Sequence, residues 1–152
     1  MKIISGGQTG ADRGGLDAGR ELGLKIGGWC PRGRRAEDGR IPSEYPLVET
    51  NSAGYVDRTR ENVFSADATI IFVHGVVSGG SETTERYCTF SGKPYLVVNL
   101  SEDVAWDETI GDWVGMVKPE VLNVAGSRES KAPGIQKTVR DILVMAIGGR
   151  SE

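Results

Sequence analysis

The stretch Lys2-Ile3-Ile4-Ser5-Gly6-Gly7-Gln8-Thr9-Gly10-Ala11-Asp12, residues 2–12, decides the fold predicted for this chain. Its first four residues favour a β-strand, two glycines end that strand, and a segment able to form a helix follows. A strand that turns through glycine into a helix N-terminus presents free backbone N–H groups, and the helix dipole adds about half a positive charge there. The stretch therefore predicts a strand–loop–helix unit whose loop can bind an anion.

This first glycine loop fits neither of the two common phosphate-binding motifs. A P-loop requires a lysine after its last glycine, but Ala11 and Asp12 follow Gly10. The G-x-G-x-x-G spacing of dinucleotide-binding loops does not occur either, because Gly6 and Gly7 are adjacent. A tight turn without any ligand therefore stays an alternative for this loop.

A second glycine loop lies in the middle of the chain. Residues 68–74, Ala-Thr-Ile-Ile-Phe-Val-His, are nearly continuous in apolar side chains, as in a central parallel strand covered on both faces. The sequence Gly79-Gly80-Ser81 follows, and residues 82–91 are expected to form a helix. Two such units in one chain favour a ligand site more strongly than one does.

The remaining segments alternate between expected strands and expected helices. The further strands are expected at residues 24–28, 45–50, 95–100 and 121–126, and the further helices at 11–22, 51–65, 106–117 and 135–147. This alternation predicts the α/β class: a single doubly wound Rossmann-like domain, residues 1–152, with a mainly parallel sheet of about five to six strands. In the strand order 3-2-1-4-5-6, the strands before the two glycine loops would be neighbours. Both loops would then flank one crevice.

Composition and charge exclude several classes of function. The net charge is −3 and the pI is about 5.3, so general affinity for nucleic acid is not expected. The sequence shows no apolar run near 18 residues and no charged-then-apolar leader, so we expect a cytoplasmic protein that does not enter a membrane. His74 is the only histidine, and Cys30 and Cys88 are far apart, so no metal site is expected.

Some polar residues have both a functional and a structural interpretation. Residues 32–40 carry four arginines and two acidic residues, a local charge of +2, and follow the second expected strand. Arginines there favour a phosphate, although a solvated loop is the alternative. Arg58 and Asn62 share a helix face and could reach a ligand, but we favour a tie between that helix and a loop. We interpret His74 as a hydrogen-bonded structural residue and Cys30 as a buried thiol.

Longer motifs along the chain resemble the molybdenum-cofactor carrier family. They are residues 6–12, residues 28–39 (Gly-Trp-Cys-Pro-Arg-Gly-Arg-Arg-Ala-Glu-Asp-Gly), residues 58–63, residues 79–81 and residues 123–130. The resemblance covers nearly the whole chain. More distantly, that family resembles Rossmann-like nucleotide-binding proteins, among them phosphoribohydrolases and DNA-processing proteins.

The resemblance implies a protein that binds and carries or stores molybdenum cofactor (molybdopterin) without turnover. This phosphorylated pterin is anionic at its phosphate and at its oxo-metal group, and it would be held as a carried ligand. The implied partners are this small phosphorylated ligand, molybdoenzymes and further copies of the chain in a homo-oligomer. The implied cofactor-binding residues are Gly6, Gly7, Gln8, Thr9, Gly10, Ala11, Asp12, Arg34, Arg35, Gly79, Gly80, Ser81 and Thr84.

Two other functions stay open. The related phosphoribohydrolases hydrolyse the N-glycosidic bond of nucleoside monophosphates with a Pro-Gly-Gly-x-Gly-Thr-x-x-Glu motif. Here Ser78 replaces the proline and Glu82 replaces the third glycine, and Glu85 falls one position early. One position turns a helical side chain by about 100°, which makes Glu85 a weak candidate for a catalytic residue. A sensor that binds a nucleotide derivative is the third hypothesis.

Overall fold

Five short strands form the central sheet of this computed structural model, which describes residues 1–149. They are β1 (Lys2–Ile4), β2 (Lys25–Gly27), β7 (Ala68–Val73), β8 (Tyr95–Asn99) and β9 (Val121–Gly126). All neighbouring pairs are parallel, and every residue of β7 is buried, as expected for a parallel strand covered on both faces. The predicted Rossmann-like α/β fold with a five-stranded parallel sheet is confirmed.

The order of the strands differs from the predicted one. The sheet runs β2-β1-β9-β7-β8, so the last strand in sequence lies between β1 and β7. Ile3 of β1 is opposite Leu122 of β9, and Ile70 of β7 is opposite Val124 of β9. The prediction that β1 and β7 are neighbours is therefore wrong.

The segment expected to be a third strand lies outside the main sheet. Within it, β6 (Val48–Glu49) pairs only with β3 (Trp29–Cys30), in a separate parallel pair. Both residues of β6 are exposed, unlike those of a strand that helices cover on both faces.

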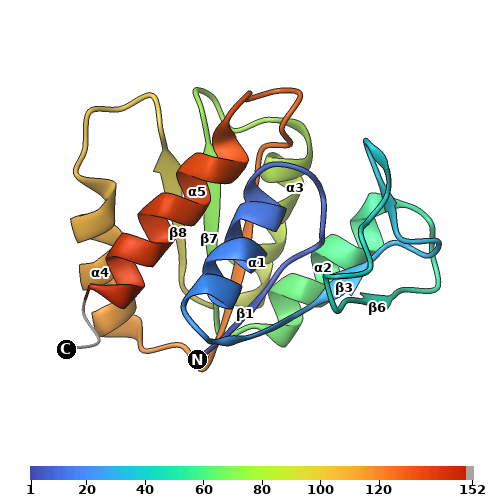
Figure 1. The fold of residues 1–152 in the computed structure, drawn as a ribbon, viewed down its shortest axis with the longest axis horizontal. Helices are drawn as coiled ribbons and strands as arrows, with labels where there is room; N and C mark the ends of the chain where they lie inside the picture. The colour runs from blue at the N-terminus through green and yellow to red at the C-terminus, as the bar shows by residue number, and fades with distance from the viewer. Residues whose placement is uncertain (150–152) are drawn as a thin grey trace.

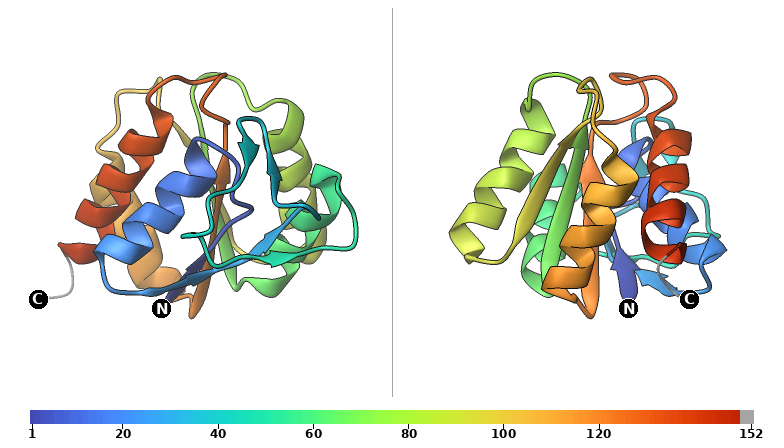
Figure 2. Two further views of the ribbon diagram at one scale, coloured as in Figure 1. Left: turned by 45° about the vertical axis from the view of Figure 1, so that its right-hand side comes forward. Right: turned by 90° about the vertical axis from the view of Figure 1, so that its left-hand side faces the viewer.

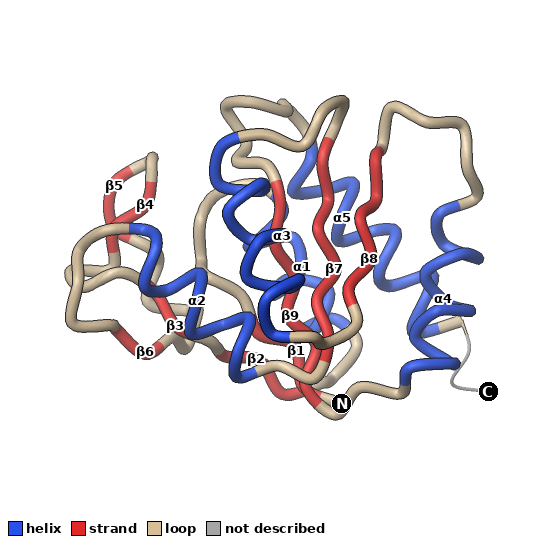
Figure 3. Tube along the Cα trace, turned by 180° about the vertical axis from the view of Figure 1, so that it is seen from behind, coloured by secondary structure: helices blue, strands red, loops and turns tan. Residues whose placement is uncertain are grey.

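Helices cover both faces of the sheet (Figure 1, Figure 2). On one face lie α1 (Ala11–Glu21), α4 (Trp106–Val117) and α5 (Ile135–Leu143), which continues as the π-helical turn η1 (Val144–Gly148). On the other face lie α2 (Tyr55–Ser65) and α3 (Gly79–Ser91), which are in front of the sheet in Figure 3. Each layer has its own buried cluster against the sheet, around Ile110 and Val139 on one side and around Val63 and Cys88 on the other.

Helix α1 approaches the sheet unusually closely because glycines face it. A Cβ on Gly15 would lie 2.6 Å from Cβ of Val124 in β9, and one on Gly19 would lie 2.6 Å from Cγ2 of Ile26 in β2. Interiors are packed at crystal-like density, so neither position has space for a larger residue. This close approach fixes the position of the α1 N-terminus relative to β9.

A small hairpin, β4 (Arg35–Ala36) and β5 (Gly39–Arg40), packs beside the first glycine loop. Arg13 of α1 forms two hydrogen bonds with Asp38 at the hairpin tip, at 2.7 and 2.9 Å. The backbone N–H of Glu37 donates to the Gln8 side chain at 2.8 Å. The hairpin is thus tied to the loop that follows β1. None of the helices in residues 1–149 is long and apolar enough to cross a membrane.

Candidate functional site

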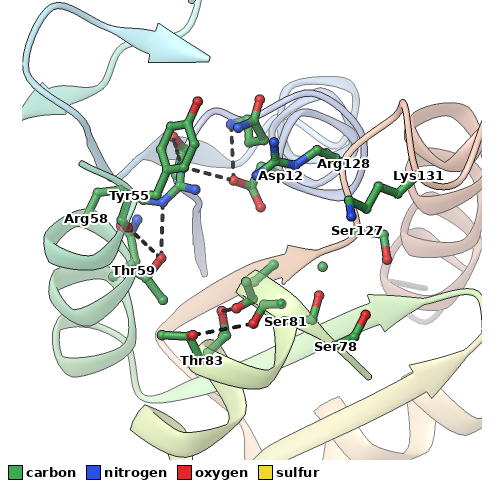
Figure 4. Close-up of a pocket in the computed structure, with 18 of the residues that line it drawn as sticks. Asp12, Tyr55, Arg58, Thr59, Ser78, Ser81, Thr83, Ser127, Arg128 and Lys131 are labelled. Atoms are coloured by element: carbon green, nitrogen blue, oxygen red, sulfur yellow. Dashed lines mark hydrogen bonds and ion pairs between the residues drawn. The ribbon is translucent and has the colours of Figure 1, made fainter. Parts of the chain in front are cut away.

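A cavity of about 700 Å³ opens where β1, β9 and β7 end, between the first glycine loop, α2 and α3 (Figure 4). Its volume lies within the range of small-molecule and cofactor sites, and the carboxyl ends of parallel strands are where such sites occur. Its polar and charged lining side chains are Gln8, Asp12, Tyr55, Arg58, Thr59, Asn62, His74, Ser78, Ser81, Thr83, Thr84, Asn123, Ser127, Arg128 and Lys131.

Both glycine loops contribute to this one cavity, as predicted, although their strands are not neighbours. The carboxyl end of β9 lies between them and adds Ala125 and Gly126 to the lining. Of the residues expected to bind the ligand, seven line the cavity: Gly6, Gln8, Asp12, Gly79, Gly80, Ser81 and Thr84.

Four expected residues of the first loop lie behind the cavity wall: Gly7, Thr9, Gly10 and Ala11. Gly10 precedes α1 with φ of 81°, and a Cβ there would overlap the carbonyl oxygen of Ser127 and the nitrogen of Glu129. The N–H of Ala11 donates to that same carbonyl at 3.1 Å. The N-terminus of α1 is therefore closed by the loop after β9, and the anion site expected there does not fit the structure.

The N-terminus of α3 is open by contrast. The N–H groups of Gly79 and Gly80 have no acceptor among residues 1–149, and the side chain of Ser78 does not cap them. A Cβ on either glycine would meet nothing within 4 Å, so a ligand can approach this backbone closely. Free N–H groups and the positive end of the helix dipole face the cavity here.

Three arginines from three different segments surround the ring of Tyr55. The guanidinium carbons of Arg35, Arg58 and Arg128 lie 5.0, 5.0 and 5.5 Å from the ring centroid. Arg58 is buried and also donates to the carbonyl of Gly6 at 3.0 Å, whereas Arg35 is exposed and does not line the cavity. These contacts with the Tyr55 ring bring three positive charges together at one end of the cavity.

Arg34 is directed away from the cavity. Its backbone has φ of 56°, and its buried guanidinium donates to the carbonyls of Ile41, Pro42 and Tyr45 at 3.2, 2.7 and 2.8 Å. These bonds hold the ends of the hairpin together. The expectation that Arg34 closes over a ligand does not fit this placement, because three hydrogen bonds to backbone carbonyls hold its guanidinium outside the cavity lining.

Asp12 is the only acidic residue in the cavity lining. Its Oδ2 accepts the N–H of Gln8 at 3.1 Å and lies 3.7 Å from Nη1 of Arg58. Burial raises the pKa of Asp12, and the nearby Arg58 and the Gln8 N–H offset this only in part. With Arg58, Arg128 and Lys131 as its cations, the lining has a net charge of +2 in a protein of net charge −3.

Glu37 holds the hairpin against the far side of the first glycine loop. Its carboxylate accepts hydrogen bonds from the hydroxyl of Thr9 and, at 2.5 Å, from that of Ser130. Burial alone would raise the pKa of Glu37, but the bonds from Ser130 and Thr9 and the charge of Arg128 lower it on balance. The adjacent Gln8 uses its Oε1 to accept from Thr9 and Glu37, while its buried Nε2 has no partner within residues 1–149.

Three residues that the sequence analysis interpreted as structural also line the cavity. Asn62 bonds the backbone of Trp29 at 2.9 and 3.0 Å and Arg58 bonds Gly6, so both tie α2 to loops as favoured, yet both line the cavity too. His74 is exposed at the cavity without a hydrogen-bond partner among residues 1–149, contrary to its structural interpretation.

The cations of the loop after β9 were missed because that strand was placed at the end of the sheet. Arg128 and Lys131 come from this loop. Arg128 reaches over the ring of Tyr55, 5.5 Å from its centroid, and Figure 4 shows Lys131 on the opposite side of the cavity from Thr59. The family motif at residues 123–130 was the available signal for Arg128.

No group of three or more metal-ligating side chains occurs in the described part of the chain, residues 1–149. Cys30 and Cys88 are buried, as expected for Cys30, and neither lines the cavity. Burial raises the pKa of both thiols, to about 11 for Cys88. The cavity therefore offers hydrogen bonds and positive charge rather than thiolate ligands.

Comparison with known proteins agrees with this fold. The crystal structure of a "Putative molybdenum carrier protein" from Syntrophus aciditrophicus is 40% identical and superposes with a TM-score of 0.91, covering 96% of this chain and 94% of that one. The search of curated proteins found no match. The model of the family described as "Circularly permutated YpsA SLOG family" matches residues 3–147. The chain therefore belongs to the circularly permutated YpsA SLOG family.

Proposed function

We propose that the protein binds molybdenum cofactor in the cavity between the first glycine loop, α2 and α3, and carries or stores it without turnover. The open N-terminus of α3 is the observation that carries this proposal. It presents the N–H groups of Gly79 and Gly80 to the cavity with free space around them. A phosphate bound there would complete the hydrogen bonds that the helix itself leaves unmade.

The remaining charges suit a ligand with a second anionic group. Arg58, Arg128 and Lys131 line the cavity away from α3, and Arg35 adds a further charge beside Tyr55. The phosphate of the cofactor would bind α3, and its anionic oxo-metal end would face these cations. The metal arrives as part of the ligand, since neither cysteine lines the cavity. The similarity to a protein named as a molybdenum carrier supports the same ligand.

Hydrolysis of nucleoside monophosphates has less support. The glutamate considered for that reaction, Glu85, is on α3 but does not line the cavity. The cavity carboxyl group is Asp12, which is already engaged by Gln8 and Arg58 through one of its oxygens.

The test is retention of the cofactor by two glycine variants. Molybdenum cofactor released from a molybdoenzyme is mixed with the protein, and the bound fraction is measured after desalting as pterin fluorescence. Gly80→Val places a branched side chain where the phosphate would approach, while Gly115→Val makes the same change at an open, exposed position of α4. Losing one charge-assisted hydrogen bond costs about 1.5–3 kcal/mol, which corresponds to a loss of affinity of about tenfold or more in Gly80→Val.

Gly115→Val should bind like the wild type. Equal retention by all three proteins would refute an anion site at α3. Retention by none of them would refute cofactor binding as a whole.

A further inference from the structure

One oxygen of the only carboxylate in the cavity is unused. Asp12 is 6% exposed, and its Oδ2 takes the contacts with Gln8 and Arg58. Its Oδ1 accepts no hydrogen bond from any of residues 1–149. Figure 4 shows that the contacts of Asp12 reach one oxygen while the other points into the space between α1 and α3. The contacts with Gln8 and Arg58 therefore use only one of the two oxygens of this carboxyl group.

Two asparagine side chains, Asn62 and Asn123, line the same cavity. Asn62 is locked, because both ends of its amide bond to Trp29. Asn123 of β9 is tied at one end only, to the hydroxyl of Thr69 at 3.4 Å, and also lines the cavity. The wall formed by Asp12 and Asn123 thus has unused capacity for hydrogen bonds, and its charged member can only accept when it is ionised.

The opposite wall presents backbone donors. Helix α3 presents N–H donors from Gly79 and Gly80, and Ser81 is beside them. In Figure 4, Ser78, Ser81 and Thr83 lie across the open space from Asp12. A ligand that fits both walls has an anionic group at one end and N–H donors at the other.

We propose that Asp12 is the specificity-determining residue of this site and that it accepts the adjacent ring N–H and exocyclic NH2 of a 2-amino-4-oxopyrimidine edge. Pterins and guanine share this edge. The unused Oδ1 would accept one of its two parallel N–H bonds, and the lone pair of Oδ2 that Gln8 leaves free would accept the other. The inference rests on the proposed function, since the anionic group of the same ligand is the one bound at α3.

Other ligands would offer fewer N–H donors to the Asp12 carboxylate. Adenine presents an acceptor nitrogen beside its amino group, so a lone pair would face the carboxylate. Hypoxanthine has the ring N–H but lacks the amino group. A metal ion would need further ligands, and no cluster of three such side chains occurs within residues 1–149.

The experiment measures dissociation constants by calorimetry for GMP, IMP, AMP, guanosine and neopterin monophosphate. The wild type should bind GMP about fivefold or more tightly than IMP, the low end of the discrimination that one bidentate hydrogen-bonding pair gives, and AMP more weakly still. In Asp12→Asn the amide oxygen keeps the Gln8 N–H, so the NH2 faces the cavity and meets another donor. The preference for GMP over IMP should fall to about twofold or less.

A matched control is Asp17→Asn. Asp17 is on the same helix, bonds to Tyr45 and Gln136, and lies outside the cavity, so this variant should keep the preference for GMP. The ratio of the dissociation constants for IMP and GMP is measured on the wild type alone. A folding defect in Asp12→Asn therefore cannot prevent this part of the test. The dissociation constants for neopterin monophosphate and GMP show whether the site prefers a pterin or a guanine.

Equal affinity of the wild type for GMP and IMP would overturn the assignment of Asp12, and so would an undiminished preference in Asp12→Asn. If only neopterin monophosphate binds, an unchanged dissociation constant in Asp12→Asn overturns it and a loss of about tenfold supports it. If no nucleotide or pterin binds, both proposals fail. Equal affinity for GMP and guanosine would overturn the anion site at α3 alone.

Discussion

Arg34 and Arg35 are adjacent in sequence, and the structure predicts opposite consequences for their removal. Arg34→Ala deletes a buried guanidinium that donates to three carbonyl groups, at 3.2, 2.7 and 2.8 Å. The substitution keeps a Cβ at φ of 56°, so backbone strain is unchanged and the loss of the guanidinium is isolated. Arg35→Ala removes an exposed side chain with one bond to Ala53 at 3.3 Å and a contact with the Tyr55 ring.

The size of the effect follows from the three carbonyl groups. Each buried acceptor left without a partner costs about 1–3 kcal/mol. Water can reach Pro42 most readily, because that residue is exposed. We therefore take the low end for each and expect Arg34→Ala to lower the free energy of unfolding by about 3 kcal/mol. For a chain of this length that corresponds to a decrease in melting temperature of about 6–12 °C. The exposed cation–π contact of Arg35 is worth about 0.5–1 kcal/mol.

Urea unfolding followed by tryptophan fluorescence measures this difference, provided that the slope with urea is the same in all variants. Cofactor retention is measured in parallel below the melting temperature of each protein. Arg35→Ala should lose at most about 1 kcal/mol of stability and up to about tenfold in affinity, because it removes a charge beside the cavity. A variant Arg34→Ala that unfolds like the wild type but fails to bind the cofactor would refute this reasoning. Arg34 would then act on the ligand rather than on the hairpin.

Two further predictions concern packing and pH. Gly15→Ala should destabilise the fold by about 1–3 kcal/mol through overpacking, because its Cβ would lie 2.6 Å from Val124, whereas Gly115→Ala on open α4 surface should stabilise it by about 0.5–1 kcal/mol in urea unfolding. Equal effects would contradict the close approach of α1 to β9. The bonds from Arg13 hold the pKa of Asp38 below its usual value, so Asp38 stabilises the fold above its unfolded pKa, and this is lost as pH falls through the lowered folded pKa. Because Asp38 is half exposed, Asp38→Asn should cost only about 1 kcal/mol at pH 7, and this cost should disappear as pH falls through the lowered folded pKa; a cost that persists in acid would contradict this.

Local patterns predicted the elements well, because local interactions form them. Helix α4 and strand β9 have the bounds expected from apolar spacing and from Pro119, which cannot continue a helix. Strand order has no such local signal. Strand β9 fits between β1 and β7 where glycines allow the backbone and side chains to approach closely. A Cβ on Gly126 would overlap the carbonyl oxygen of Phe72 in β7, and Gly15 of α1 leaves room for Val124.

For the site, the sequence predicted only those parts that have a local signal. Gly6, Asp12 and the loop at residues 79–81 could be found, since a glycine-bounded turn into a helix is visible in sequence. The choice between Arg34 and Arg35 could not be made, because it depends on the left-handed backbone at Arg34 that turns its side chain toward three carbonyl groups. A local charge count cannot distinguish an arginine that binds backbone from one that faces a ligand.

The position of β9 also explains why only one of the two glycine loops is open. The loop after β9 crosses the start of α1, where the Ser127 carbonyl accepts the Ala11 N–H that an anion would otherwise bind. The same loop brings Arg128 and Lys131 to the cavity, and these side chains add positive charge to its lining. The α1 end of the cavity is then free to hold a carboxylate, and Asp12 in the first turn gains from the helix dipole there. A ligand with a phosphate at both ends would meet Asp12 at one of them. The arrangement therefore favours a ligand with one phosphate, bound at α3, and N–H donors facing α1.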